Sequence, residues 1–186
     1  TSSTRRRAFL SHFYPQHTAV EMRGNLQTRL EKLKKGDCDA MLLAFAGVHR
    51  MEMESYIAEH LSLDQFVPAV GQGSVAIQCA VSLDSSLKTL VRKACNHPGT
   101  EAALLAERHL LAHLEGGCSV PVYGHAYLEG EKLKLQAGVL SLDGIENIYH
   151  SAEGSDPAIL GKEVAMELIQ LGAHQLLRKI RQQLGS

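Results

Sequence analysis

The sequence contains no long apolar run and no low-complexity tract. No window approaches 18 consecutive apolar residues, so no transmembrane helix is predicted. The first ten residues, TSSTRRRAFL, are basic and lack the apolar stretch and small-residue cleavage site of a secretory signal peptide. We therefore expect a cytoplasmic protein that does not bind membranes.

The sequence also contains no closely spaced pair of cysteines. Cys38, Cys79, Cys95 and Cys118 lie far apart and form no CxxC motif, which argues against a disulfide framework and against a cysteine zinc site. We expect all four to be thiols. Apolar residues make up 45% of the 186 and charged residues 21%, so the chain can fold as one domain or two small ones.

The net charge of −1 conceals an asymmetry along the chain. Residues 1–50 contain nine Lys or Arg against four Asp or Glu, which gives +5 and leaves −6 for the remainder. Six of the ten arginines lie in this first stretch, and a guanidinium suits bidentate capture of carboxylate or phosphate. We expect an anionic partner there, whereas Lys32, Lys34 and Lys35 are typical of solvated surface charges.

The first half alternates between helical and strand-like patterns. A short helix is predicted around residues 8–13, and a second at 25–35, ended by Gly36. Strands are predicted at 17–23 and at 39–46, the latter an apolar run typical of a strand buried on both faces. Strand, helix and strand in succession predict a βαβ unit and hence an α/β domain with a parallel sheet.

Two arginines follow the predicted strands. Arg23 and Arg50 fall at or just after the strand ends. Ligands of open α/β sheets bind at the carboxyl ends of the strands. We therefore expect both guanidiniums to face one crevice.

The middle of the chain contains a predicted glycine turn, Gly71-Gln72-Gly73. A helix is predicted before it, at 51–61, and an apolar strand after it, at 74–81. The turn alone is a weak signal, because tight turns need glycine as often as ligands do. The polar, weakly patterned residues 82–99 predict a domain boundary.

The last part has a different pattern. Thr100 caps a predicted helix at 101–115, and a long amphipathic stretch at 157–184, interrupted at Gly172, supplies one or two covering helices. Between them, Glu-Gly130 and Asp-Gly144 are strong hairpin signals. They predict an α+β domain with a three-stranded antiparallel sheet, its strands at 120–128, 132–140 and 145–151.

Cys118 differs from the other cysteines in its surroundings. It follows two glycines at a predicted helix end and precedes Ser-Val-Pro, so it lies on a short loop where a thiol can be accessible. The other three border or occupy apolar segments, where buried thiols are ordinary. The pattern alone leaves both a chemical and a structural role open for Cys118.

Six ordered blocks give the chain a family resemblance from Thr1 to its C-terminus. They are Thr1-Ser-Ser-Thr-Arg-Arg6, Arg23-Gly-Asn25, Thr28-Arg29-Leu30, Ala46-Gly-Val-His-Arg50, Ala69-Val-Gly-Gln-Gly73 and Leu114-Glu-Gly-Gly-Cys-Ser-Val-Pro121. In order and spacing the chain resembles the porphobilinogen deaminases, also called hydroxymethylbilane synthases. The resemblance implies a partial α/β domain like those of bilobed anion-binding proteins, followed by the C-terminal α+β domain.

The resemblance also implies a function in tetrapyrrole biosynthesis. Enzymes of this family are transferases that join four porphobilinogen molecules head to tail, with release of ammonia, to give hydroxymethylbilane. The chain grows on a dipyrromethane cofactor bound through a thioether, here to Cys118. Cofactor and growing polypyrrole are polyanions, which suits the arginine-rich half; no metal and no nucleic acid is implied. The matching cofactor-binding positions are Ser3, Arg5, Arg6, Arg23, Gly24, Arg29, Arg50 and Gln72, with Arg7 outside them.

The chain departs from the family in one respect. Family members begin with a further segment that forms most of a first domain and carries the catalytic aspartate, whereas Glu21 and Asp39 do not match its position. We therefore expect a fragment without the catalytic residue, inactive alone and monomeric when complete, or a chain whose remaining part is separate. Expected divisions are the arginine-lined α/β domain at 1–67, a return segment of the first domain at 68–92, and the cofactor-attachment domain at 93–186.

Two other readings remain open from the residues. An anion-binding module without catalysis would explain the arginines but not Cys118 in its glycine loop. A metal site could be built from His109 and His113, an i, i+4 pair, with Cys118 nearby in sequence. Three ligands are too few for a closed structural zinc site.

Overall fold

A three-stranded antiparallel sheet forms the centre of the molecule, in a computed structural model that describes residues 1–115 and 120–185. The strands follow one another in the order β1-β2-β3, with Val122 opposite Val139 and Val139 opposite Ile148. Both connections turn at glycines with positive φ, Gly130 and Gly144, as the hairpin signals predict. The strands are β1 (Val122–Glu129), β2 (Lys132–Leu140) and β3 (Asn147–Gly154).

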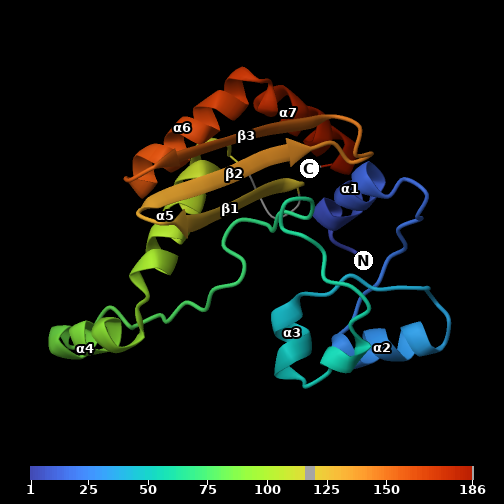
Figure 1. Cartoon of the computed structure of the whole chain (residues 1–186), viewed down its shortest axis with the longest axis horizontal. Coiled ribbons are helices and arrows are strands. Elements are labelled where there is room, and N and C mark those ends of the chain that lie inside the picture. The colour runs from blue at the N-terminus through green and yellow to red at the C-terminus, as the bar shows by residue number, and fades with distance from the viewer. Residues whose placement is uncertain (116–119, 186) are drawn as a thin grey trace.

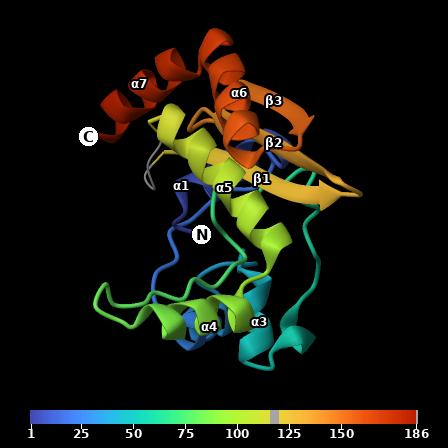
Figure 2. The same cartoon turned by 90° about the vertical axis from the view of Figure 1, so that its left-hand side faces the viewer.

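Three helices cover one face of this sheet (Figures 1 and 2): α5 (Pro98–His113), α6 (Pro157–Gln170) and α7 (Ala173–Leu184). Asp156 caps α6 by accepting hydrogen bonds from the first-turn amides of Ala158 and Ile159. Gly172, with φ of 102°, separates α6 from α7. The meander and its covering helices are therefore confirmed.

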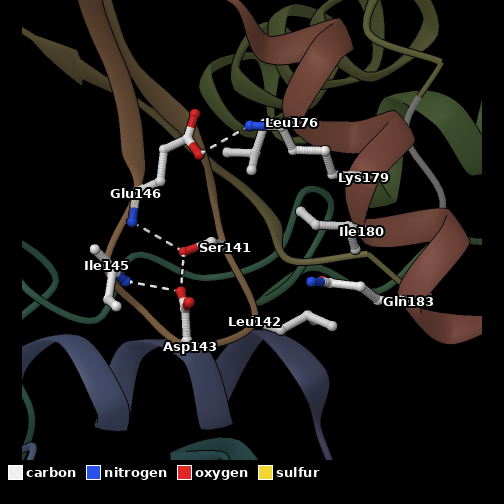
Figure 3. A pocket seen from close by; sticks show the side chains of 9 residues that line it. All are labelled: Ser141, Leu142, Asp143, Ile145, Glu146, Leu176, Lys179, Ile180 and Gln183. Atoms are coloured by element: carbon white, nitrogen blue, oxygen red, sulfur yellow. Dashed lines mark hydrogen bonds and ion pairs between the residues drawn. The ribbon is translucent and has the colours of Figure 1, made fainter.

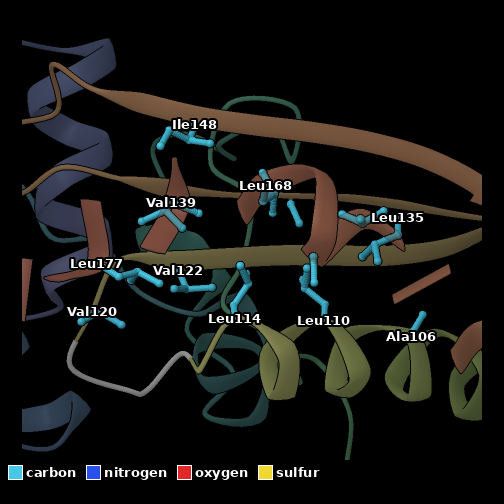
Figure 4. Packing of buried hydrophobic residues seen from close by; sticks show 14 of the residues in the cluster. Ala106, Leu110, Leu114, Val120, Val122, Leu135, Val139, Ile148, Leu168 and Leu177 are labelled. Carbon is cyan, nitrogen blue, oxygen red and sulfur yellow. The ribbon is translucent and has the colours of Figure 1, made fainter. Parts of the chain in front are cut away.

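The main core lies between the sheet and these helices (Figure 4). Inward positions alternate along each strand and meet the apolar faces of the helices. Leu110, Leu135 and Leu168 are fully buried, and each contributes about 1.5–3 kcal/mol by leaving water. This core stabilises the C-terminal part of the chain.

A second, smaller core joins the N-terminal helix to the opposite face. Helix α1 (Thr4–Phe13) buries Ala8 and Phe9 against Tyr123 of β1, with ring centroids of Phe9 and Tyr123 5.0 Å apart. Phe66, Val67 and Leu140 complete this cluster. The first helix is thereby fixed to the C-terminal sheet.

The remaining elements bury little. Met22, Leu30 and Val48 are the buried apolar residues described between α1 and Phe66, and α4 buries none. In Figures 1 and 2 these elements lie apart from the sheet and are joined by irregular segments. They are α2 (Leu26–Lys34), α3 (Phe45–Arg50), the 3₁₀ turn η1 (Glu54–Tyr56) and α4 (Ser85–Cys95).

The three strands predicted at 17–23, 39–46 and 74–81 are wrong for this structure. A strand needs a neighbour for its backbone groups, and no described segment pairs with any of the three. Residues 45 and 46 instead begin α3, and the side chains of Val75 and Val81 are 95% and 97% exposed. The βαβ unit is therefore not formed among residues 1–115 and 120–185.

Two helix predictions also need correction, and one helix was not predicted. The helix expected at 51–61 is reduced to η1, because Glu52 has a left-handed φ of 55°. The boundary expected at 82–99 contains α4, which Asp84 caps through the amides of Ser86 and Leu87. Helix α5 begins at Pro98, not after Thr100, with His97 as its N-cap.

The structure as described is a mixed α/β fold with a three-stranded antiparallel sheet. Over residues 1–115 and 120–185, none of the helices combines the length and apolarity needed to cross a membrane.

Candidate anion-binding site

Two arginines lie in the first turn of α1. Ser3 caps this helix, its hydroxyl accepting a hydrogen bond from the Arg6 amide at 3.4 Å. The half-buried guanidiniums of Arg5 and Arg6 donate to the carbonyls of Val67, at 2.5 Å, and Leu42, at 3.0 Å. These long-range bonds fix both side chains against segments 36 and 62 residues away.

Arg29 occupies the corresponding place in α2. Asn25 caps that helix by accepting from the Thr28 amide at 2.9 Å. The Nε of Arg29 donates to the carbonyl of Gly24 at 2.8 Å. Gly24 has φ of 120°, and a Cβ there would lie 3.0 Å from Thr28, so a glycine is needed for this turn.

The three guanidiniums interact electrostatically. Burial, and secondly the charge of Arg6, lower the pKa of Arg5 to about 10. Burial, and secondly the charge of Arg29, lower the pKa of Arg6. Repulsion among these positive charges is therefore present in the folded protein.

Among the described residues, no carboxylate pairs with the cluster formed by Arg5, Arg6 and Arg29. Within the described ranges 1–115 and 120–185, no Asp or Glu oxygen lies within 4.0 Å of any of them. Helices α1 and α2 also have no acid in their first turns, where Asp and Glu would be favourable. Positive side chains at positive helix ends are unfavourable unless an anion is bound between them.

The other predicted site residues are not brought into this cluster. Arg23 is 78% exposed and pairs with Glu21 at 3.4 Å. Arg50 is exposed at the end of α3, and Gln72 is exposed in its glycine turn. Cys118 lies outside the described residues.

Sequence reasoning missed one buried acid, Glu107 of α5. It is 4% exposed, and its carboxylate accepts hydrogen bonds from the Gly71 amide at 2.6 Å and the Ala126 amide at 2.9 Å. Burial raises its pKa, against the opposing effects of these amides and of His125. The signal was available, because Glu107 shares the apolar helix face of Ala106, Leu110 and Leu114.

The cavity in Figure 3 is not this site. It has a volume of about 390 Å³ and lies between the β2–β3 turn and α7. Its polar groups already bind one another: Asp143 accepts from Ser141, and Lys179 lies 3.7 Å from Glu146. None of the predicted site residues that the structure describes lines it.

The histidine pair and the three described cysteines are the remaining candidates for metal or thiol chemistry. His109 and His113 have ring centroids 6.5 Å apart, and the ring of His113 bonds the carbonyl of His109. No cluster of three potential metal ligands occurs in the described ranges. Cys38 and Cys79 are half-buried free thiols, and Cys95 is exposed at the end of α4, contrary to the buried environment expected for it.

The chain is thus a mixed α/β protein with a cluster of three arginines near the N-termini of α1 and α2. Comparisons with known proteins show its family. Residues 1–88 match the family described as "Porphobilinogen deaminase, dipyromethane cofactor binding domain", and residues 101–170 match "Porphobilinogen deaminase, C-terminal domain". The porphobilinogen deaminase of Desulfosudis oleivorans is 44% identical over 98% of this chain, and that of Cytophaga hutchinsonii is 47% identical over all of it. The chain belongs to the porphobilinogen deaminase family.

The matched relatives are longer than this chain. The chain spans about 60% of the length of both proteins, and the same holds for the porphobilinogen deaminase of Geobacillus kaustophilus, at 40% identity. The arginine cluster falls in the region matching the cofactor-binding family, and Cys118 falls in the region matching the C-terminal family.

Proposed function

We propose that this chain is the cofactor-carrying part of a hydroxymethylbilane synthase. The complete enzyme would join four porphobilinogen molecules head to tail, releasing one ammonia for each. Family membership gives the reaction, and the observation that carries the assignment of a site is the cluster of Arg5, Arg6 and Arg29 without acidic partners. An anion-binding module without catalysis would not require Cys118 in its glycine loop.

The residues present fit a dipyrromethane group. Each pyrrole of such a group carries an acetate and a propionate, and guanidiniums that hydrogen-bond only to carbonyl groups keep further N–H donors for carboxylates. When bound, the group supplies the pyrrole carbon from which the product chain extends. The arginines would hold its carboxylates, and Cys118 would attach it through a thioether.

The remaining predicted positions complete this proposal. Arg23, Arg50 and Gln72 lie on the surface, where they could meet the later, more distant carboxylates of the growing polypyrrole. The catalytic carboxylate would lie in the part of the relatives that this chain does not span. No acid of the described residues stands beside the cluster to replace it.

The same proposal divides the chain. Residues 1–67 would complete a bilobed α/β domain, 68–92 would return to its first lobe, and 93–186 would carry the attachment site. The exposed apolar side chains of residues 75, 77 and 81 support this division, because a partner surface would cover them. The complete enzyme would act as a monomer on porphobilinogen.

A chimera tests the function. This chain replaces the matching region of the Cytophaga hutchinsonii relative, and the formation of ammonia and of hydroxymethylbilane from porphobilinogen is measured for the chimera and for this chain alone. The proposal predicts hydroxymethylbilane from the chimera and none from the chain. Product from the chain alone would refute the claim that the catalytic carboxylate lies outside this chain. A folded but inactive chimera would refute the assigned reaction.

A further inference from the structure

Glu107 joins two segments that are otherwise far apart in the chain. One carboxylate oxygen accepts from the amide of Gly71, 36 residues away, and the other from the amide of Ala126, 19 residues away. Both oxygens of the buried carboxylate therefore have a partner. The two bonds are charge-assisted, the stronger class of hydrogen bond.

The free edge of β1 explains this arrangement. Among the described residues, strand β1 is paired with β2 on one side and with no strand on the other, so alternate amides of that other side lack a ladder partner. The Gly124 amide donates to the carbonyl of Pro68 at 3.1 Å, which places the segment 68–71 along this edge. Glu107 supplies the next acceptor, for the Ala126 amide, and so continues the ladder where the chain turns away.

Packing supports the same docking. Val70 packs on the main core, and a Cβ at Gly124 would lie 3.2 Å from Val70 and 2.8 Å from Leu110. The absence of a side chain at Gly124 thus permits the close approach. At the other end of the segment, Arg5 donates to the carbonyl of Val67.

Stability alone is a poor explanation for a carboxylate at this position. Burying a charge is costly, and an apolar residue of similar size commonly serves a helix–sheet interface at least as well. His125, 3.9 Å away, is the described titratable group that faces Glu107, and it does not form a close pair with it. What the carboxylate adds is a fixed position for the Gly71 amide.

We propose that Glu107 is a positioning residue that holds the Gly71-Gln72-Gly73 turn in register with α5, so that Gln72 can meet the anionic ligand. Helix α5 ends at His113, five residues before Cys118. The hydrogen bonds of Glu107 therefore join the turn to the helix that precedes the proposed attachment site. This inference rests on the proposed function. Its structural part is testable without it.

The test compares Glu107→Gln with Glu101→Gln in this chain. Glu101 is a matched control on the same helix, where its carboxylate bonds Arg92 and Asn96 at the surface. Gln keeps one acceptor but turns an NH₂ group toward the second amide. We expect hydrogen exchange at Gly71 or Ala126 to accelerate about 10-fold or more in Glu107→Gln and not in Glu101→Gln.

Porphobilinogen binding is the second readout. We expect its dissociation constant to rise about 10-fold in Glu107→Gln while Glu101→Gln remains at the wild-type value. If hydrogen exchange at both amides is unchanged in Glu107→Gln, Glu107 does not hold the turn. If exchange is faster but the affinity for porphobilinogen is unchanged, Glu107 has no positioning role. If the wild-type chain does not bind porphobilinogen, the proposed function is contradicted. The exchange measurement would still show whether Glu107 holds the turn.

A third measurement needs no variant, in case Glu107→Gln does not fold. The amide proton shifts of Gly71 and Ala126 in the wild-type chain should titrate together with the side-chain carboxyl carbon of Glu107. Separate titration of the two amides would overturn the proposal.

Discussion

Arg6 and Arg7 are neighbours on one helix with different environments. Arg6 is half-buried and donates to the carbonyl of Leu42, whereas Arg7 is exposed. We predict that Arg6→Ala weakens porphobilinogen binding about 10- to 100-fold, because a partly desolvated carboxylate loses a charge-assisted hydrogen bond. Arg7→Ala is the control, with little change expected. Isothermal titration measures both, and equal effects would remove Arg6 from the site.

The buried carboxylate of Glu107 makes a pH prediction at the same scale. Its pKa is raised by burial above the ordinary value of 4.5. The folded state therefore binds this proton more tightly than the unfolded state, and stability falls as pH rises from about 4.5 through the folded pKa. His125, 3.9 Å away, opposes the shift when it is charged.

Denaturant unfolding across this pH range checks the sign. The free energy of unfolding of the wild type should fall with rising pH relative to that of Glu107→Gln, which cannot titrate at this position. A difference that stays constant, or that grows in favour of the wild type, would contradict the assigned pKa direction.

Individual residues also show what a sequence can and cannot reveal. The arginines were identifiable because guanidinium chemistry and motif spacing are local properties. Which arginines lie near one another was not predictable, since the effect of Arg29 on Arg6 depends on how α1 and α2 are placed in the fold. Glu107 was visible as an acid on an apolar helix face, but its amide partners lie 36 and 19 residues away.

At the scale of elements, the β2–β3 hairpin docks on α1. The ring of His12 bonds the carbonyl of Gly144 at 2.6 Å, and a Cβ on Gly144 would lie 2.6 Å from the His12 backbone nitrogen. Gly130 also turns a hairpin with positive φ, but a Cβ there would meet nothing within 4 Å. A substitution at Gly130 therefore adds backbone strain alone, whereas the same substitution at Gly144 adds backbone strain and a steric clash with α1.

We predict that Gly144→Ala lowers the free energy of unfolding by about 1–3 kcal/mol more than Gly130→Ala does. Both variants carry the strain of alanine at positive φ, and only Gly144→Ala pushes α1 from the sheet. Urea denaturation measures the difference. Equal losses would show that the hairpin does not rest tightly on α1.

Elements stabilised by local signals were the ones predicted best. The meander follows from period-two alternation and two glycine turns. Helices α6 and α7 follow from their amphipathic pattern and the break at Gly172. The strands expected at 17–23, 39–46 and 74–81 require neighbours that the described chain does not provide. Periodicity reports which side chains seek burial, not whether a pairing strand is present.

At the scale of the whole molecule, the chain combines a compact C-terminal core with an N-terminal half that buries few residues. The two are connected by the α1 cluster and by the segment 66–71, which Arg5 holds at Val67 and Glu107 holds at Gly71. The same contacts therefore hold both the arginine cluster and the C-terminal domain that we propose as the attachment domain. In the proposed enzyme, these contacts would present a covalently attached polyanion to the arginines.

The intact mass of the protein shows whether such a group is attached. The chimera with the Cytophaga hutchinsonii relative is produced in cells that make porphobilinogen, as wild type, as Cys118→Ala and as Cys95→Ala, the last removing an exposed thiol as a control. We predict the added mass of one dipyrromethane in the wild type and in Cys95→Ala, and none in Cys118→Ala. An unmodified wild type, or an adduct that persists in Cys118→Ala, would contradict the attachment of dipyrromethane to Cys118.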